Sequence, residues 1–239
     1  MDISLIIPAY NEEKRIGDTI TKASHFLQEH FKQYEIIVVD DGSEDKTVEI
    51  IRKIDDKRIA CIALEQNCGK GRAVQVGMNS ARGRYCLFTD ADLPYRLESI
   101  LKAIDVFQKT HADVVIGSRD LFKDKPDAAY PLYRKVMSMV FSTYMNVVLG
   151  LGITDTQCGF KAFTYEAANI IFPKLTVAGF GFDVELLYVA KKNKMHVGMI
   201  PVNLRHTGDS KINIITDSLK MMKDTVKVRI NNYKGQYDK

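Results

Sequence analysis

The chain has 239 residues, 46% of them hydrophobic and 27% charged, which is an ordinary composition for a globular protein with one sizeable core. Its formal net charge of +4 is too small to indicate binding to nucleic acid. No apolar run reaches the ~20 residues that a membrane-spanning helix needs.

Short apolar runs and helical patterns alternate through the first half of the chain. In chain order, the pattern predicts a strand at 3–7, a helix at 15–31, a strand at 35–39, a helix at 45–54, a strand at 59–64, a helix at 71–81, a strand at 85–89, a helix at 97–110 and a strand at 113–117. Ser43 with Asp45 is placed to cap the second helix, and Gly83 follows the third. Fully apolar strands that alternate with helices predict an α/β, Rossmann-like fold, with a mostly parallel sheet and helices on both faces.

The second half is less regular. A charged loop at 120–127 precedes it, and it mixes helices with short strands. No linker or low-complexity segment divides the chain. We therefore expect residues 1–211 to form one domain, with residues 212–239 as a C-terminal helical elaboration of the same domain.

The C-terminal pattern predicts one long helix at 212–234. Five apolar residues form a stripe on it, namely Ile215, Leu219, Met222, Val226 and Ile230. Four lysines lie to one side of the stripe (Lys220, Lys223, Lys227 and Lys234), and Asp217 and Asp224 lie opposite. Two interpretations remain open: a helix that lies on an anionic membrane surface, or a helix packed on its own domain with its lysines in solvent. The uncharged stretch 136–151 is a second candidate for membrane contact.

The four cysteines are Cys61, Cys68, Cys86 and Cys158, and they include no C-x-x-C pair. Cys61 and Cys86 fall in predicted buried strands, so we expect reduced thiols and no zinc site. The chain starts with a strand rather than with a basic segment and an apolar run. We therefore expect no signal peptide and a cytoplasmic protein.

Asp90 and Asp92 follow directly after the predicted strand at 85–89. Neighbouring carboxylates repel each other unless a positive group lies between them. Mg²⁺ takes one or two protein carboxylates together with substrate phosphates, and ligands of open α/β sheets bind beyond the carboxyl ends of strands. The pair therefore suggests a metal-assisted site for a phosphorylated substrate. Taken alone, however, it is more often a polar turn before the next helix, and only the rest of the chain shifts the balance to the metal site.

Two other strand ends are polar. Pro8 to Glu13 follows the first strand, and Asp40 to Ser43 follows the second. In a right-handed parallel sheet these ends lie on the same edge as Asp90 and Asp92, so we expect one acidic crevice with a tyrosine ring and an amide beside it.

Basic residues near glycines suggest anion binding. The segment 67–73, N-C-G-K-G-R-A, resembles a phosphate loop at a helix N-terminus and would offer Lys70 and Arg72 to a diphosphate, although a glycine-rich turn explains it equally well. Ser118 and Arg119 end the fifth strand, and Arg134 and Lys211 come later. These residues form a second anion site if they converge, and otherwise they are solvated surface charges.

Taken together, P-A-Y-N-E at 8–12, V-V-D-D-G-S at 38–43, N-x-G-K-G-x-A at 67–73, D-A-D at 90–92 and G-S-R at 117–119 resemble the family 2 glycosyltransferases. More narrowly, the chain resembles the polyprenyl-phosphate sugar synthases, which include dolichyl-phosphate glucosyltransferases and dolichyl-phosphate mannose synthases. The match extends through 155–161, 181–185 and 208–211, and the segment 210–235 looks closer to the glucosyl enzymes.

This resemblance implies a GT-A fold and transfer of a hexose, with inversion, from a nucleotide-diphosphate sugar to a polyprenyl or dolichyl phosphate. UDP-glucose is the favoured donor and GDP-mannose the next. The implied donor-binding residues are Pro8, Ala9, Tyr10, Glu12, Asp40, Lys70, Asp90 and Ala91. Asp90 and Asp92 would hold Mg²⁺ or Mn²⁺, and with Arg119 they are the implied catalytic residues. The implied acceptor-phosphate residues are Ser118, Arg119, Arg134 and Lys211.

A lipid acceptor implies a protein on the cytosolic face of a membrane, held there peripherally. One position departs from the mannosyl relatives, which often carry an amide two residues after the second aspartate, where this chain has Pro94. A phosphate monoester has a second pKa of about 6, so it needs orientation rather than a strong general base. Two alternatives stay open: a glycosyltransferase with a soluble or glycan hydroxyl acceptor and Asp183 or Glu185 as its base, or a non-catalytic nucleotide-sugar-binding module.

Overall fold

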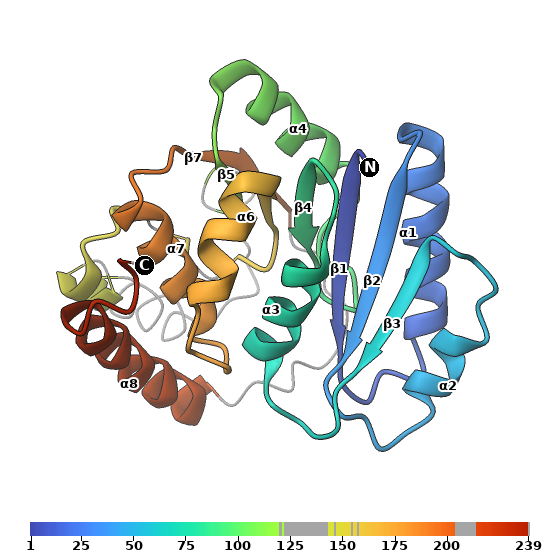
Figure 1. Ribbon diagram of the computed structural model, residues 1–239, viewed down its shortest axis with the longest axis horizontal. Helices are drawn as coiled ribbons and strands as arrows, with labels where there is room; N and C mark the ends of the chain where they lie inside the picture. The colour runs from blue at the N-terminus through green and yellow to red at the C-terminus, as the bar shows by residue number, and fades with distance from the viewer. Residues whose placement is uncertain are drawn as a thin grey trace, which may run out of the picture.

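The computed structural model describes residues 1–119, 121, 143–145, 147–153, 155–156, 158–203 and 214–238, with only the backbone described at 214–219. Its centre is a seven-stranded sheet in the order β3-β2-β1-β4-β6-β5-β7 (Figure 1). The strands are β1 Ile3–Ala9, β2 Tyr34–Asp40, β3 Ile59–Ala63, β4 Tyr85–Phe88, β5 Val114–Ser118, β6 Lys161–Thr164 and β7 Val197–Pro201.

Helices cover both faces of this sheet. They are α1 Ile16–His30, α2 Thr47–Arg52, α3 Lys70–Ser80, α4 Ser99–Thr110, α6 Tyr165–Ile171, the short 3-10 helix Phe172–Lys174, α7 Phe182–Lys192 and α8 Ile214–Tyr233. One face packs against α1, α2 and α4, and the other against α3, α6, α7 and α8 (Figure 1). The structure has two hydrophobic cores, one on each face of the sheet. Successive side chains of a strand point to opposite faces, so Leu5 and Ile7 of β1 lie in one core and Ile6 lies in the other.

All nine elements predicted in the first half are present, and each ends within two residues of its predicted limits. The predicted mostly parallel sheet is confirmed for β1 to β4, which pair in parallel. The sequence did not indicate that β6 would enter between β4 and β5 and run antiparallel to both. Its start therefore lies at the same sheet edge as the ends of β4 and β5.

The predicted caps and one predicted burial are only partly right. At the start of α2, Asp45 Oδ1 accepts from the amide of Thr47, the first helical residue (2.9 Å), as expected, whereas the hydroxyl of Ser43 accepts a hydrogen bond from the Asn11 amide (2.8 Å) instead. The helix α3 ends where Ala81 becomes extended, while Gly83 donates its N–H to the hydroxyl of Ser4 (2.7 Å). Cys86 is buried as expected, but Cys61 is only half-buried because it lies on the edge strand β3.

The C-terminal helix packs with a face other than the predicted stripe. Its contacts with the core come from Met221 and Val228, with Thr225 buried between them. Met222, Val226 and Ile230 of the predicted stripe are 36%, 47% and 47% exposed. The helix thus packs on its own domain with Lys220, Lys223, Lys227 and Lys234 exposed, as one of the two interpretations expects, but it does so through a face other than the predicted stripe. Among the described residues, no helix combines the length and the hydropathy needed to cross a bilayer.

A buried ion pair joins β6 to α7. The Lys161 side chain is 0% exposed, and its Nζ donates to Asp183 Oδ1 (2.6 Å) and to the Cys158 carbonyl (2.7 Å). Asp183 lies in the first turn of α7, and Lys161 lies opposite Phe88 at the end of β4. The pair thus fixes α7 against the sheet beside the segment that carries Asp90 and Asp92.

We predict that Lys161→Met lowers the free energy of unfolding by about 3–5 kcal/mol, because it leaves the buried Asp183 carboxylate without its ion pair. The double variant Lys161→Met/Asp183→Leu should recover most of that loss, since apolar residues of similar volume replace the whole pair. Urea denaturation measures both. The control Lys22→Met removes an exposed pair with Asp18 and should cost less than about 1 kcal/mol. Equal losses for Lys161→Met and Lys22→Met would contradict this account.

Candidate active site

The carboxyl ends of β2, β1 and β4 lie side by side at one edge of the sheet. Ala9 stands opposite Asp40 in the register of β1 and β2, and the Thr89 amide donates to the Ile6 carbonyl across β1 and β4 (3.0 Å). The predicted convergence of the three polar strand ends is therefore confirmed.

The loops after β1 and β2 are tied to each other by side chains. The Glu44 amide donates to Asn11 Oδ1 (2.9 Å), and the Glu13 amide donates to Asp45 Oδ2 (3.1 Å). Asn11 itself has a positive φ of 53°. The two loops thus form one platform. Beside it, β1 ends with Pro8 and Ala9, the Tyr10 ring is exposed, and Glu12 is partly buried.

Asp40 carries a buried acceptor at this platform. Its Oδ2 accepts from the Ser43 amide (3.0 Å), while its buried Oδ1 has no hydrogen-bond partner among the described residues. A buried acceptor without a partner costs about 1–3 kcal/mol, so it suits the N–H or O–H of a bound molecule.

The neighbouring Asp41 has a different task. It is buried, and its two oxygens accept from the amides of Cys68 and Gly69, both at 2.8 Å. Gly69 has a φ of 98°, and a Cβ there would lie 2.6 Å from the Ala178 carbonyl. Asp41 therefore fixes the glycine-rich segment that starts α3, a role that the sequence analysis did not assign. The predicted place of this segment at a helix N-terminus is confirmed, because α3 begins at Lys70.

Lys70 and Asp90 form the central charge contact, with Nζ 2.5 Å from Oδ1. Burial works to lower the pKa of Lys70, but the carboxylates of Asp90, Asp183 and Asp92 outweigh it, and the pKa is raised. Arg72, in contrast, donates its Nη1 to Gln75 further along α3 (2.7 Å).

The donor set fits a divalent cation that is shared with a phosphorylated ligand. Asp90 and Asp92 supply two carboxylates past the end of β4, and Ala91 is buried between them, with its carbonyl accepting from the Thr19 hydroxyl (2.5 Å). Within the described ranges, no group of three or more acidic, histidine or cysteine residues could hold a metal ion. Mg²⁺ and similar ions commonly complete such a pair with substrate phosphates and water.

Arg119 leaves the end of β5 and is held by Asp155. Its backbone N–H, Nε and Nη2 all donate to that carboxylate, at 2.8, 3.0 and 2.6 Å. Ser118 beside it is buried. The other two predicted acceptor residues, Arg134 and Lys211, lie outside the described residues, as do Asp120 and much of the 120–127 and 136–151 stretches.

The two carboxylates considered as general bases are both engaged. Burial raises the pKa of Asp183 although Lys161 and Lys70 oppose it, and Lys161 occupies its Oδ1. Glu185 is fully buried and accepts from the Val177 amide (2.8 Å) and the Tyr237 hydroxyl (2.6 Å). These contacts weigh against a hydroxyl acceptor activated by either residue.

Residues 4–172 match the family described as Glycosyl transferase family 2, and the chain belongs to this family. It is a glycosyltransferase. Over 98% of its length it is 36% identical to the dolichyl-phosphate beta-glucosyltransferase of Dictyostelium discoideum, covering 75% of that protein. It is likewise 34% identical to the dolichyl-phosphate beta-glucosyltransferase of Homo sapiens, with coverages of 98% and 77%.

Solved structures give the same fold. Glucosyl-3-phosphoglycerate synthase from Mycobacterium tuberculosis in complex with UDP superposes with a TM-score of 0.70 at 17% identity, over 95% of this chain and 79% of that one. The same enzyme in complex with Mg²⁺ and UDP gives a TM-score of 0.68 at 15% identity, over 96% and 78%. The predicted α/β GT-A fold is confirmed.

We predict that Asp41→Asn lowers the free energy of unfolding by about 1–3 kcal/mol. The new amide nitrogen would face one of the two backbone N–H groups at Cys68 and Gly69 and leave it without an acceptor. Thermal and urea denaturation measure the loss. Asp55→Asn, at an exposed carboxylate, is the matched control and should stay within about 0.5 kcal/mol of the parent. Parent-like stability of Asp41→Asn would show that this carboxylate does not hold the loop.

Proposed function

We propose that this glycosyltransferase moves glucose from UDP-glucose to a polyprenyl or dolichyl phosphate, with inversion at the anomeric carbon and with Mg²⁺ or Mn²⁺. The observation that carries the proposal is the similarity along almost the whole chain to proteins named dolichyl-phosphate beta-glucosyltransferases. The paired carboxylates at the end of β4, with two separately held cations Lys70 and Arg119, support it.

On the donor side, the buried Asp40 Oδ1 would accept from the nucleoside, with Pro8, Ala9, Tyr10 and Glu12 around it. Asp90 and Asp92 would hold the divalent cation, which supplies charge stabilisation to the departing nucleotide diphosphate. Lys70 adjoins Asp90 and would face the same diphosphate.

On the acceptor side, Arg119 would orient the lipid phosphate, with Ser118, Arg134 and Lys211 as further proposed contacts. A phosphate oxygen attacks the anomeric carbon from the face opposite the nucleotide. The bond from that carbon to the diphosphate oxygen breaks, and its electron pair leaves with UDP. The acceptor is already an anion near neutral pH, so no side chain has to remove a proton. The engagement of Asp183 and Glu185 agrees with this mechanism.

We predict that Asp92→Asn, or EDTA added to the parent protein, reduces glucose transfer from UDP-glucose to a short polyprenyl phosphate on the order of 10³-fold. Several kcal/mol of charge stabilisation would be lost, and each 1.4 kcal/mol is about tenfold. Calorimetry should also show weaker binding of UDP in Mn²⁺. The control Asp105→Asn changes an exposed carboxylate on α4 and should do neither. Full activity in EDTA would contradict the metal assignment. Transfer of mannose from GDP-mannose without any transfer of glucose from UDP-glucose would contradict the choice of donor.

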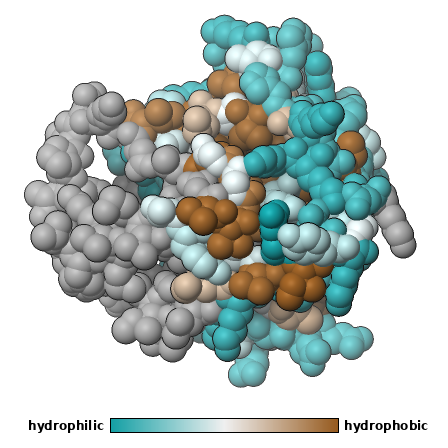
Figure 2. Space-filling model, turned by 90° about the vertical axis from the view of Figure 1, so that its left-hand side faces the viewer, coloured by the Kyte–Doolittle hydropathy of each residue, from teal (hydrophilic) through white to brown (hydrophobic). Residues whose placement is uncertain are grey.

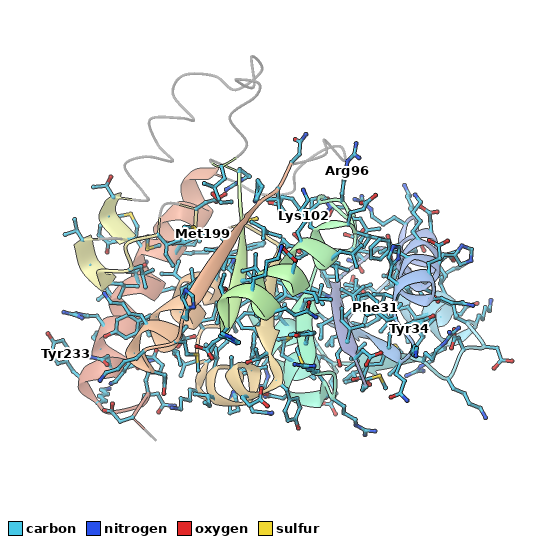
Figure 3. All side chains as sticks on the ribbon, turned by 90° about the horizontal axis from the view of Figure 1, so that it is seen from above. Phe31, Tyr34, Arg96, Lys102, Met199 and Tyr233 are labelled. Atoms are coloured by element: carbon cyan, nitrogen blue, oxygen red, sulfur yellow. The ribbon has the colours of Figure 1, made fainter. Side chains whose placement is uncertain are left out.

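The proposal extends to the membrane, where the lipid phosphate lies. The exposed stripe of α8, which we define as Met222, Val226, Ile230 and Tyr233, is available for peripheral binding on the cytosolic face. Tyr233 is 77% exposed and points away from the body of the molecule (Figure 3). Val147, 78% exposed, lies in the helical residues 147–149, and in the helical residues 143–145 the Tyr144 hydroxyl reaches the Met222 carbonyl (3.5 Å). Figure 2 shows apolar patches among hydrophilic side chains on the side of the molecule that carries these elements.

Charge favours an anionic lipid surface at this stripe. Lys220, Lys223 and Lys234 are exposed on α8 or directly after it. Each basic residue near such a surface contributes ~1 kcal/mol, and this contribution falls with salt, whereas apolar insertion persists.

We predict that the parent protein co-sediments with liposomes containing phosphatidylserine and that Lys223→Glu/Lys234→Glu weakens this binding at low salt. Val226→Ser/Ile230→Ser should weaken it at all salt concentrations. The matched controls are Lys102→Glu on α4 and Ile170→Ser on α6, both at exposed positions, and they should bind like the parent. If the parent ignores anionic liposomes at low salt, the membrane part of the proposal fails.

A further inference from the structure

A short segment before β6 lies between Asp90, on the proposed metal side of the site, and Arg119, on the proposed acceptor side. We name residues 155–156 and 158–160 the bridging segment. The Phe160 carbonyl accepts from the Gly117 amide of β5 (2.9 Å), and a Cβ at Gly159 would lie only 2.9 Å from Asp90 Oδ2. The bridging segment therefore touches Asp90 with one end and reaches Arg119 through Asp155 at the other.

Asp155 holds Arg119 by one particular edge of its guanidinium group. The carboxylate takes Nε and Nη2, and it also accepts from the Arg119 backbone N–H, so both the start and the end of the side chain are fixed. Asp155 is buried, whereas the Arg119 side chain is 44% exposed. The other edge of the fork, Nη1 with the second proton of Nη2, is the edge that can bind a phosphate bidentately.

We propose that Asp155 is a positioning residue for the acceptor: it turns the Nη1–Nη2 edge of Arg119 toward the lipid phosphate at a fixed distance from Asp90. This inference rests on the proposed function, because it assumes a phosphate-monoester acceptor at Arg119. The bridging segment sets the distance, since it contacts both the aspartate and the arginine.

A carboxylate so near an anionic acceptor would also repel it. Two contacts offset that effect here. Arg119 lies against both oxygens of Asp155, and the buried Lys161 ammonium acts on the same carboxylate. The alignment of the fork thus outweighs the repulsion, and removal of the Asp155 charge should weaken acceptor binding rather than strengthen it.

The experiment compares the parent, Asp155→Asn, Arg119→Ala and the double variant, with UDP-glucose, Mn²⁺ and water-soluble citronellyl phosphate. Asp155→Asn keeps the shape of the side chain but loses the charged double contact. We expect its acceptor KM to rise roughly tenfold, while the Kd of UDP measured by calorimetry stays unchanged. In the Arg119→Ala background the same substitution should change the acceptor KM less than about twofold, because the group that it positions is gone.

Two further variants separate positioning from folding. Arg119→Lys keeps a positive charge beside Asp155 but lacks the planar fork of the guanidinium group, so its acceptor KM should also rise roughly tenfold. This measurement still tests the role of the fork if Asp155→Asn does not fold. The control is Asp113→Asn. Asp113 directly precedes the first residue of β5, at the end of the strand away from Arg119, and its carboxylate accepts from the His196 amide, so this substitution should leave the acceptor KM unchanged.

Each contrary result has a distinct meaning. If Arg119→Ala leaves the acceptor KM unchanged, the acceptor site of the proposed function is wrong and the inference falls with it. If Arg119→Ala raises the acceptor KM but Asp155→Asn and Arg119→Lys do not, only the inference is overturned. Equal effects of Asp155→Asn with and without Arg119, or a changed Kd for UDP, would likewise overturn it.

Discussion

The ammonium group of Lys161 is the buried charge around which this site is arranged. It is fully enclosed, and it joins β6 to the first turn of α7 through Asp183. A lysine in an apolar sheet is stable only when a carboxylate and other acceptors surround it, so its position fixes both elements. Because β6 is antiparallel, its start meets the ends of β4 and β5. The bridging segment, Asp90 and Arg119 all depend on that arrangement.

Two cationic side chains of the site, Lys70 and Arg119, are each paired with an aspartate, but the two ion pairs have different consequences. Lys70 contacts Asp90, which is also the proposed metal ligand, so this pair would have to share its charge with the ion and the diphosphate. Arg119 contacts Asp155, which has no other proposed ligand. In the first pair, the positive charge of Lys70 lies against Asp90 and also acts on Asp92, which offsets the repulsion between the two carboxylates, and the second pair gives the arginine one fixed orientation. A site for two anionic substrates needs both, because free cations on mobile side chains would lose entropy on each binding event.

The sequence predicted the first half of the fold well because its strands are apolar throughout and its helices are periodic. The strand β6 escaped prediction since it is four residues long, contains Lys161 and pairs with strands that are distant in the chain. Asp40, Asp90 and Arg119 could be singled out because they end strands. The roles of Asp41 and Asp155 could not, since the first depends on which way one of two adjacent aspartates points, and the second on a partner 36 residues away. The D-T-Q-C-G-F-K motif at 155–161 was the available signal for Asp155 and Lys161.

The helix α8 shows a related limit of periodicity. Its sequence contains two overlapping faces, one with Met221 and Val228 and one with Met222, Val226 and Ile230, and only tertiary contacts decide which is covered. Polar contacts also hold the observed orientation. Asn231 Nδ2 and Lys227 Nζ of α8 donate to the hydroxyl and the carbonyl of Thr176 (2.8 and 3.2 Å), while Met221 and Val228 are buried.

The loop at 176–178, which begins with Thr176, links α8 to the donor side of the site. Glu185 holds the amides of Thr176 and Val177, and two residues further along the Ala178 carbonyl accepts from the Arg72 amide in the first turn of α3 (3.2 Å). The three-residue stretch 176–178 therefore contacts both α8 and the glycine-rich segment carrying Lys70, which Asp41 holds from its other side. A surface that holds the exposed stripe of α8 would thereby also fix the height of the donor pocket above the lipid phosphate, which is the geometric condition for transfer to an acceptor anchored in a membrane.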